Sequence, residues 1–287
     1  MSFAIAVTPH PLRKAAASLL DAARDALETR NVHIPALPWA VAGLLTAGAP
    51  PPLPWFVNAL TSNDALSSAV LRMANSPSYQ PRTPIMSVAQ AGTRLGVNAI
   101  AEMALAASVR TQLFCVEGFE NELREMWQQA LAAAVFAREL GRSCGISGLE
   151  GFTCGLLHEI GRPLALAEAV RRCPDCGWVA TRPETRQAVL SVAAALAPLA
   201  GACIVEAWNL PDLLASAIVR HDPSFRVTES PRATVAHMAT QMAGSLYRRE
   251  SPWDLGGRHA VAVNDATAAA LPDLGYSVRT WVDSLTV

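Results

Sequence analysis

The sequence predicts an all-α fold, and three observations support this prediction. Apolar residues recur three or four positions apart along most of the chain, which is the spacing of one face of a helix. Two segments, Ser87–Gln90 and Ser147–Glu150, have the Ser-x-x-Gln/Glu pattern of a capping box, which satisfies free backbone N–H groups at a helix start. We find no segment with the alternation of apolar and polar residues that is typical of a half-buried strand.

The first third of the chain begins with an amphipathic helix predicted over Pro11–Arg30, where charged residues lie between the apolar positions. The segment Asn31–Asn63 carries no formal charge, and its prolines divide it into short pieces. We therefore expect two short helices around a proline-rich loop. A further helix is predicted over Asp64–Ala74, and the prolines that follow end it.

In the middle of the chain, the capping box at Ser87 starts a helix that Gly96 closes. Asn98 is the predicted cap of the next helix, which reaches Cys115, and a longer helix is predicted over Phe119–Leu140 with Gly141 as its end. The second capping box leads into the apolar stretch GFTCGLLHEIGRPLAL at residues 151–166. This central helix carries His158 and Glu159 at its end, where Gly161 and Pro163 stop it.

The last part of the chain also reads as helices. They are predicted from Pro163 to about Arg172, over Arg186–Trp208, from Pro211 to His221, from Pro231 to Arg249 and, more weakly, over Asp265–Leu271. The segment 187–205 is uncharged, but alanine dominates it and Pro198 interrupts it, which favours a buried core helix over a membrane span.

Composition and charge exclude several classes of function. The chain has 51% hydrophobic and 16% charged residues, which indicates a globular protein, and its net charge of −1 provides no basic surface for nucleic acid. The N-terminus lacks the order of charged, apolar and small residues that marks a secretory signal, so we expect a cytoplasmic protein. We predict no membrane contact, and the oligomeric state stays open.

The six cysteines do not form the pattern of a disulfide scaffold. Cys173 and Cys176 have the spacing of half a zinc site or of a redox pair, but tetrahedral zinc needs four ligands. We therefore predict a cysteine-containing turn at CPDC. A thiol-based or zinc-linked sensor is the alternative at this position.

Four motifs in fixed order carry a resemblance to a known family. They are Met73–Ser76, Ser87–Gly96, Gly155–Gly161 and Ala207–Pro211, the last followed by Arg220 and His221. Over roughly Val32–Met242 the chain resembles the HDOD family, the HD-related output domains of bacterial signalling proteins. The resemblance implies an HD-domain-like helical bundle with an added N-terminal helical subdomain and a C-terminal helical extension. We accordingly divide the chain into an N-terminal helix (1–30), the HDOD-like domain (31–250) and an extension (251–287).

The resemblance also implies where the metal ligands of a true HD hydrolase would lie. The first histidine falls near Gln129, the His-Asp pair is His158 and Glu159, and the last acid falls near Thr240. Two of these positions have lost a ligand, and a hard divalent ion needs carboxylate and imidazole groups that converge on it. We therefore expect a vestigial site without metal, in which His158 bonds to a backbone carbonyl or another side chain.

A second constellation, His221, Asp222 and His237, is a possible ligand pocket, because the family places histidines of enzymes with an extra metal nearby. The resemblance thus implies a non-catalytic regulatory or output domain without a cofactor, which binds a protein partner in a signalling pathway or a small signalling ligand. The alternative is a metal-dependent HD-type phosphohydrolase that acts on a cyclic dinucleotide, with these three residues joining His158 and Glu159 as ligands.

Overall fold

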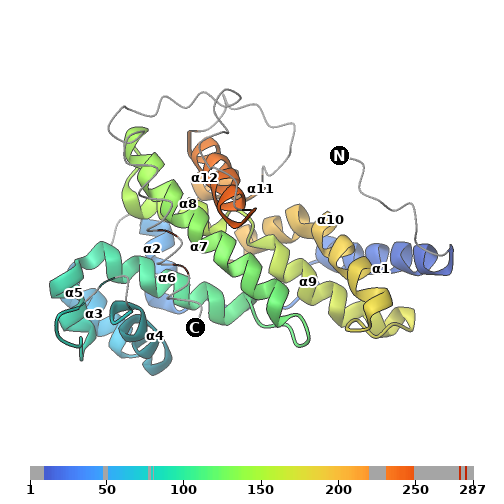
Figure 1. Ribbon diagram of the computed structural model, residues 1–287, viewed down its shortest axis with the longest axis horizontal. Coiled ribbons are helices and arrows are strands. Elements are labelled where there is room, and N and C mark those ends of the chain that lie inside the picture. Colours follow the sequence, from blue (N-terminus) through green and yellow to red (C-terminus); the bar gives the residue numbers. More distant parts are fainter. Residues whose placement is uncertain are drawn as a thin grey trace.

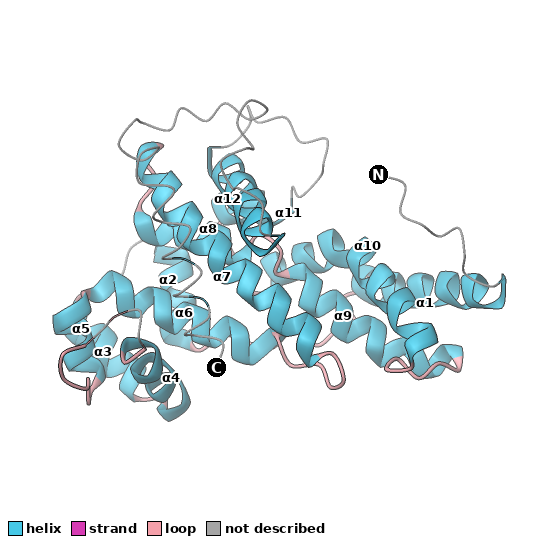
Figure 2. Ribbon diagram, in the orientation of Figure 1, coloured by secondary structure: helices cyan, strands magenta, loops and turns pink. Residues whose placement is uncertain are grey.

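The computed structural model describes residues 10–47, 51–76, 79, 81–219, 231–248, 278 and 282, and it contains no strand within these residues. The prediction of an all-α fold is therefore confirmed (Figure 1; Figure 2). The helices are α1 (His10–Glu28), α2 (Trp39–Ala47), α3 (Leu53–Thr61), α4 (Asp64–Ala74), α5 (Val88–Leu95), α6 (Val97–Leu113), α7 (Glu120–Ser143), α8 (Gly148–Leu157), α9 (Gly161–Arg172), the 3-10 helix η1 (Cys173–Cys176), α10 (Pro183–Ala207), α11 (Asp212–Val219) and α12 (Pro231–Arg248).

The predicted serine caps are present at both helix starts. The Ser87 hydroxyl accepts the Gln90 N–H at 3.1 Å, and the Ser147 hydroxyl accepts the Glu150 N–H at 3.2 Å. In a standard capping box the Gln90 side chain would accept the N–H of the cap residue, Ser87. Here it accepts the N–H of Met86, one residue earlier. The Glu150 carboxylate instead pairs with Arg232 of α12, so it ties α8 to the C-terminal helix.

Several predicted helix boundaries are wrong. Gly161 and Pro163 do not stop a helix, because α8 already ends at Leu157 and both residues lie in the first turn of α9. Helix α10 begins at Pro183 rather than at Arg186.

Asn98 does not cap α6, which begins at Val97 after Gly96, with no side-chain bond at the cap. Gly141 does not end α7, which continues to Ser143. The terminating glycine is Gly145, whose φ of +71° lets the Gly145 and Ile146 N–H groups bond the carbonyls of Arg142 and Gly141.

The helices form three neighbouring groups (Figure 1). At one end α3, α4 and α5 pack on one another and on α6, which α2 also contacts. In the centre α7 and α8 form an antiparallel hairpin that α12 covers, and α6 packs on α8. At the other end α9 and α10 pack together, with α1 against both and α11 joining α10 to α8 and α12. The turn between α8 and α9 therefore connects the central group to the far one.

Glycines allow the helices on both sides of this turn to approach their neighbours closely. A Cβ atom at Gly155 of α8 would lie 2.7 Å from the Ala134 Cα of α7 and would also collide with the Ala133 carbonyl. A Cβ atom at Gly161 of α9 would lie 2.5 Å from the Gly201 N of α10 and would collide with the Ala197 carbonyl. These contacts involve backbone atoms that cannot rotate away, so they fix the position of His158 and Glu159.

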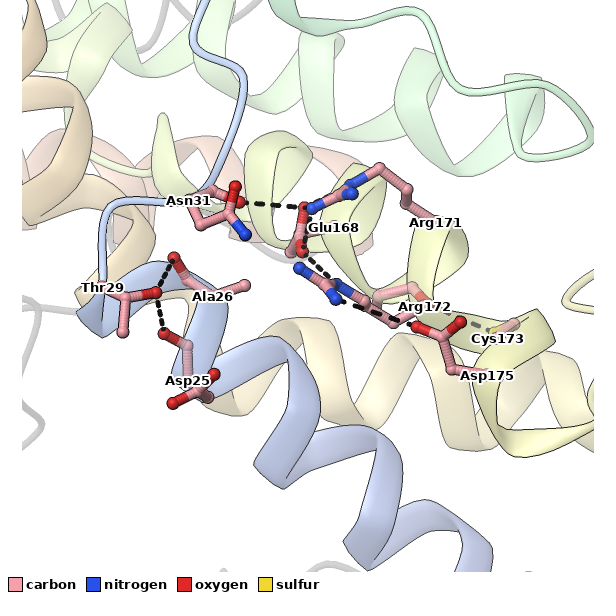
Figure 3. A network of polar contacts seen from close by, with 10 residues as sticks. Asp25, Ala26, Thr29, Asn31, Glu168, Arg171, Arg172, Cys173 and Asp175 are labelled. Carbon is pink, nitrogen blue, oxygen red and sulfur yellow. Dashed lines mark hydrogen bonds and ion pairs between the residues drawn. The ribbon is translucent and has the colours of Figure 1, made fainter.

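Polar contacts attach the N-terminal helix to the far group. The buried Glu168 carboxylate of α9 accepts bonds from Arg171 and Arg172 at 2.8–2.9 Å, and Arg171 also donates to the Asn31 carbonyl just after α1 (Figure 3). The Cys203 thiol of α10 donates to the Leu27 carbonyl at 3.4 Å. Helix α1 thus packs directly on α9 and α10, and the predicted division of the chain at residues 30 and 250 stays a prediction.

Helix α10 is long and apolar enough to cross a membrane by length and composition, with a mean hydropathy of 2.3 over its most apolar window. Such values are also typical of core helices. Here 44% of that window is buried, and Val189, Leu196 and Ile204 belong to the hydrophobic core. The helix packs against α1, α9 and α11, as the sequence predicts for a core helix.

Candidate functional site

His158 lies directly after the last residue of α8, where its side chain is 3% exposed. Its Nδ1 atom is 2.6 Å from the Gly155 carbonyl oxygen. Because a carbonyl oxygen only accepts hydrogen bonds, Nδ1 carries the proton in this contact. The bond holds the imidazole against its own helix end.

Glu159 is paired with an arginine from the next helix. Its Oε2 atom is 2.8 Å from the Arg162 Nη1 atom and 3.8 Å from the His158 Nε2 atom. The carboxylate is 21% exposed, so it is partly accessible to solvent. Arg162 is a site residue that the sequence interpretation missed, although its spacing of three positions from Glu159 favours such a pair within a helical turn.

Gln129 and Arg162 lie on the same small cavity of about 180 Å³ between α7, α9 and α10. Its other lining residues are Glu122, Glu125, Met126, Leu190, Ala193 and Ala194. The fold therefore places the predicted first ligand position near the pair Glu159–Arg162. Where an HD hydrolase would carry its first histidine, this chain has the carboxamide of Gln129, and the guanidinium of Arg162 lines the same cavity.

Thr240 lies on α12, which packs against both α7 and α8. Its hydroxyl donates to the Ala236 carbonyl of its own helix at 2.7 Å. A threonine hydroxyl bonded in this way is a poor substitute for the carboxylate that an HD centre requires. The predicted position of the last acidic ligand therefore lies on α12, next to the helices of the site, but the residue at this position is Thr240 and not an acid.

These donors do not fit a divalent metal centre. The His158 Nδ1–H group bonds to a backbone carbonyl, which leaves Nε2 as the only ring nitrogen that a metal could use. The Glu159 carboxylate, however, is neutralised by Arg162. Within the described part of the chain, no group of three histidine, cysteine, aspartate or glutamate residues could hold a metal ion. A hard ion needs several carboxylate or imidazole ligands around one point.

Of the possible ligand pocket of His221, Asp222 and His237, the structure describes one residue. His237 lies on α12 with a half-buried side chain. His221 and Asp222 lie outside the described residues. This pocket, like the predicted helix over Asp265–Leu271, therefore stays a prediction.

Cys173 and Cys176 form the single turn η1, which ends at Gly177 with a φ of +69°. The buried Cys173 thiol donates to the Ala169 carbonyl at 3.3 Å, and burial raises its pKa to about 11. Burial also raises the pKa of Cys176. Since the thiolate is the nucleophilic form of cysteine, these thiols are weakly reactive at neutral pH.

Comparison with known proteins decides the family. The profile of the HDOD domain matches residues 52–223, which is more than half of the chain and includes Gln129, His158 and Glu159. The chain belongs to the HDOD family. This match confirms the resemblance seen in the sequence motifs, and α1, α2 and α12 of this HDOD protein lie outside the matched range.

Three solved structures share the fold. A candidate phosphohydrolase from Shewanella amazonensis is 22% identical, with a TM-score of 0.65 over 92% of this chain and 98% of the other. A candidate metal-dependent phosphohydrolase from the same organism is 18% identical, with a TM-score of 0.65 over 94% and 99%. An HDOD domain protein of unknown function from Geobacter sulfurreducens is 18% identical, with a TM-score of 0.64 over 94% and 98%. No curated protein matches the chain. At these identities the structures establish the HD-related helical fold alone.

Proposed function

We propose that this HDOD protein is a non-catalytic regulatory or output domain of bacterial signal transduction, located in the cytoplasm. It acts by binding a protein partner or a small signalling ligand. The observation that carries the proposal is the pairing of Glu159 with Arg162 at 2.8 Å. A metal at this carboxylate would have to displace a guanidinium that already balances its charge. Beside His158, the other expected ligand positions offer an amide at Gln129 and a hydroxyl at Thr240.

A second candidate is a metal-dependent phosphohydrolase, and two structural relatives carry names of this kind. Glutamate can coordinate a divalent ion as aspartate does, so Glu159 by itself is compatible with this function. The two candidates predict different behaviour for substitutions at His158 and Glu159.

Under the proposed function, His158→Ala is expected to destabilise the fold more than Glu159→Ala. The first substitution removes the donor to the Gly155 carbonyl at a buried position, which costs about 1–3 kcal/mol of unfolding free energy. The second breaks a partly exposed ion pair, which costs at most about 1 kcal/mol. Melting curves of the two variants and the wild type measure this difference.

The same three proteins should be tested for hydrolysis of cyclic dinucleotides with divalent metal supplied. The proposal predicts no turnover by any of them. Wild-type turnover that both substitutions abolish equally would establish the phosphohydrolase, because metal ligands act as one unit.

A further inference from the structure

A cavity of about 540 Å³ lies where α6 ends and α7 begins, away from the pair His158 and Glu159. Its volume is in the range of sites that hold small organic ligands, which is about 300–1,000 Å³. The lining residues combine arginines, aromatic rings, acids and apolar groups: Arg110, Phe114, Cys115, Val116, Glu117, Glu120, Leu123, Arg124 and Trp127.

Two aromatic rings form one wall of this cavity. Phe114 and Trp127 contact each other edge to face, with ring centroids 5.1 Å apart. Trp127 is only 3% exposed, and its indole N–H has no hydrogen-bond acceptor among the residues that the structure describes. Buried N–H groups of this kind normally have an acceptor, so this one indicates a missing partner.

Positive charge gathers at the same place. Arg110 and Arg124 both line the cavity. Partial burial lowers the pKa of Arg110 below its usual value, and the charges of Arg124 and Arg72 lower it further. The exposed side chain of Arg124 forms no hydrogen bond or ion pair with another described residue.

Two acids also line the cavity, but one of them is already engaged. The Glu120 carboxylate accepts the Gly118 N–H at 2.7 Å, and backbone bonds of this kind lower its pKa. Glu117 is exposed. Neither acid forms an ion pair with Arg124. An anionic ligand could therefore provide the negative charge that pairs with this arginine.

We infer that this cavity binds a small phosphorylated molecule with a planar ring. Its phosphate would bind Arg110 and Arg124, because guanidinium groups present paired donors that match phosphate oxygens. Its ring would pack against Phe114 and supply an acceptor for the Trp127 indole. The inference rests on the proposed function, since it identifies a ligand that such a regulatory domain binds without hydrolysing it.

Calorimetric titration with adenosine monophosphate, adenosine and inorganic phosphate tests this site at low ionic strength. Adenosine monophosphate is expected to bind with 1:1 stoichiometry and more tightly than either of its parts. Arg124→Gln should weaken its binding about tenfold, because one charge-assisted contact to the phosphate is lost. The matched control is Arg24→Gln, which removes an exposed arginine from α1, a helix that contributes nothing to the cavity.

Because Arg124 is exposed, its variant should melt at the wild-type temperature, which shows that any change in affinity is local. Absence of saturable binding of adenosine monophosphate would overturn the inference, and so would equal binding by wild type and Arg124→Gln. Equal affinity for inorganic phosphate would refute the ring contact. Release of phosphate from adenosine monophosphate would instead contradict the proposed function, so the two failures are distinguishable.

Discussion

Gly161→Ala is expected to lower the free energy of unfolding by about 3 kcal/mol, which is the upper end of the usual cost of overpacking. The new Cβ atom would collide with the Ala197 carbonyl and lie 2.5 Å from the Gly201 N. These atoms belong to the backbone of α10, so α9 and α10 would have to move apart. Urea unfolding followed by circular dichroism measures the effect.

Gly43→Ala is the matched control, because it also replaces a helical glycine by alanine. A Cβ atom at Gly43 would meet no described atom within 4 Å apart from its chain neighbours and the backbone of its own helix. The higher helix propensity of alanine should leave this variant unchanged or stabilise it by up to about 1 kcal/mol. Equal stabilities of the two variants would contradict the close packing of α9 on α10.

Arg138→Met is expected to cost about 3–5 kcal/mol at neutral pH, because it leaves a buried carboxylate without its counter-ion. Glu102 of α6 is 4% exposed, and its Oε2 atom is 2.9 Å from the Arg138 Nη1 atom of α7. This contact joins residues 36 positions apart and links α6, on which α2 to α5 pack, to the hairpin of α7 and α8. Arg142→Met is the control, because Arg142 is 60% exposed and pairs with Glu139 instead.

The cost of Arg138→Met should also depend on pH. Burial raises the pKa of Glu102, and Arg138 opposes that rise. A raised folded-state pKa gives a contribution to stability that is fully present below the unfolded value of 4.5 and is lost as pH rises through the folded value. Without Arg138 the folded pKa rises further, so the variant should lose less stability at pH near 5 than at pH near 8. Unfolding curves at both pH values test this, and a loss that is independent of pH would refute the account of the pair.

Features set by neighbouring residues could be predicted from the sequence. The serine caps of α5 and α8 follow from side chains three positions apart, and both are present. The bounds of α4 also match the prediction, and its cap at Asn63, which accepts the Leu66 N–H, depends on equally local chemistry. The turn at Cys173–Cys176 belongs to the same class.

Features set by tertiary contacts could not be predicted in this way. A glycine serves either to adopt a positive φ or to allow a close approach, and the sequence does not distinguish the two uses. Gly141 therefore appeared to end α7, whereas it lies within the helix and faces Gly151 of α8, and Gly145 ends it. The pairs Glu102–Arg138 and Glu122–Arg186 join residues 36 and 64 positions apart, and no local pattern marks such partners.

The candidate site also combines features that the local sequence predicts with features that depend on tertiary packing. The prediction that His158 lies at a helix end is confirmed, but the glycine and proline predicted to stop this helix begin α9 instead. The cavity that brings Gln129 close to Arg162 depends on how α7, α9 and α10 pack. The role of Arg162 could have been predicted from the sequence, because residues three positions apart in a helical turn are neighbours and Arg162 follows Glu159 at this spacing.

The central claim is that His158 and Glu159 belong to a site that has lost its metal. The most direct measurement is elemental analysis of the full chain, purified without any chelator. We predict much less than one equivalent of iron, manganese or zinc per chain, because Glu159 is paired with Arg162 and the remaining ligand positions hold Gln129 and Thr240. One or two tightly bound equivalents of any of these metals would contradict the claim.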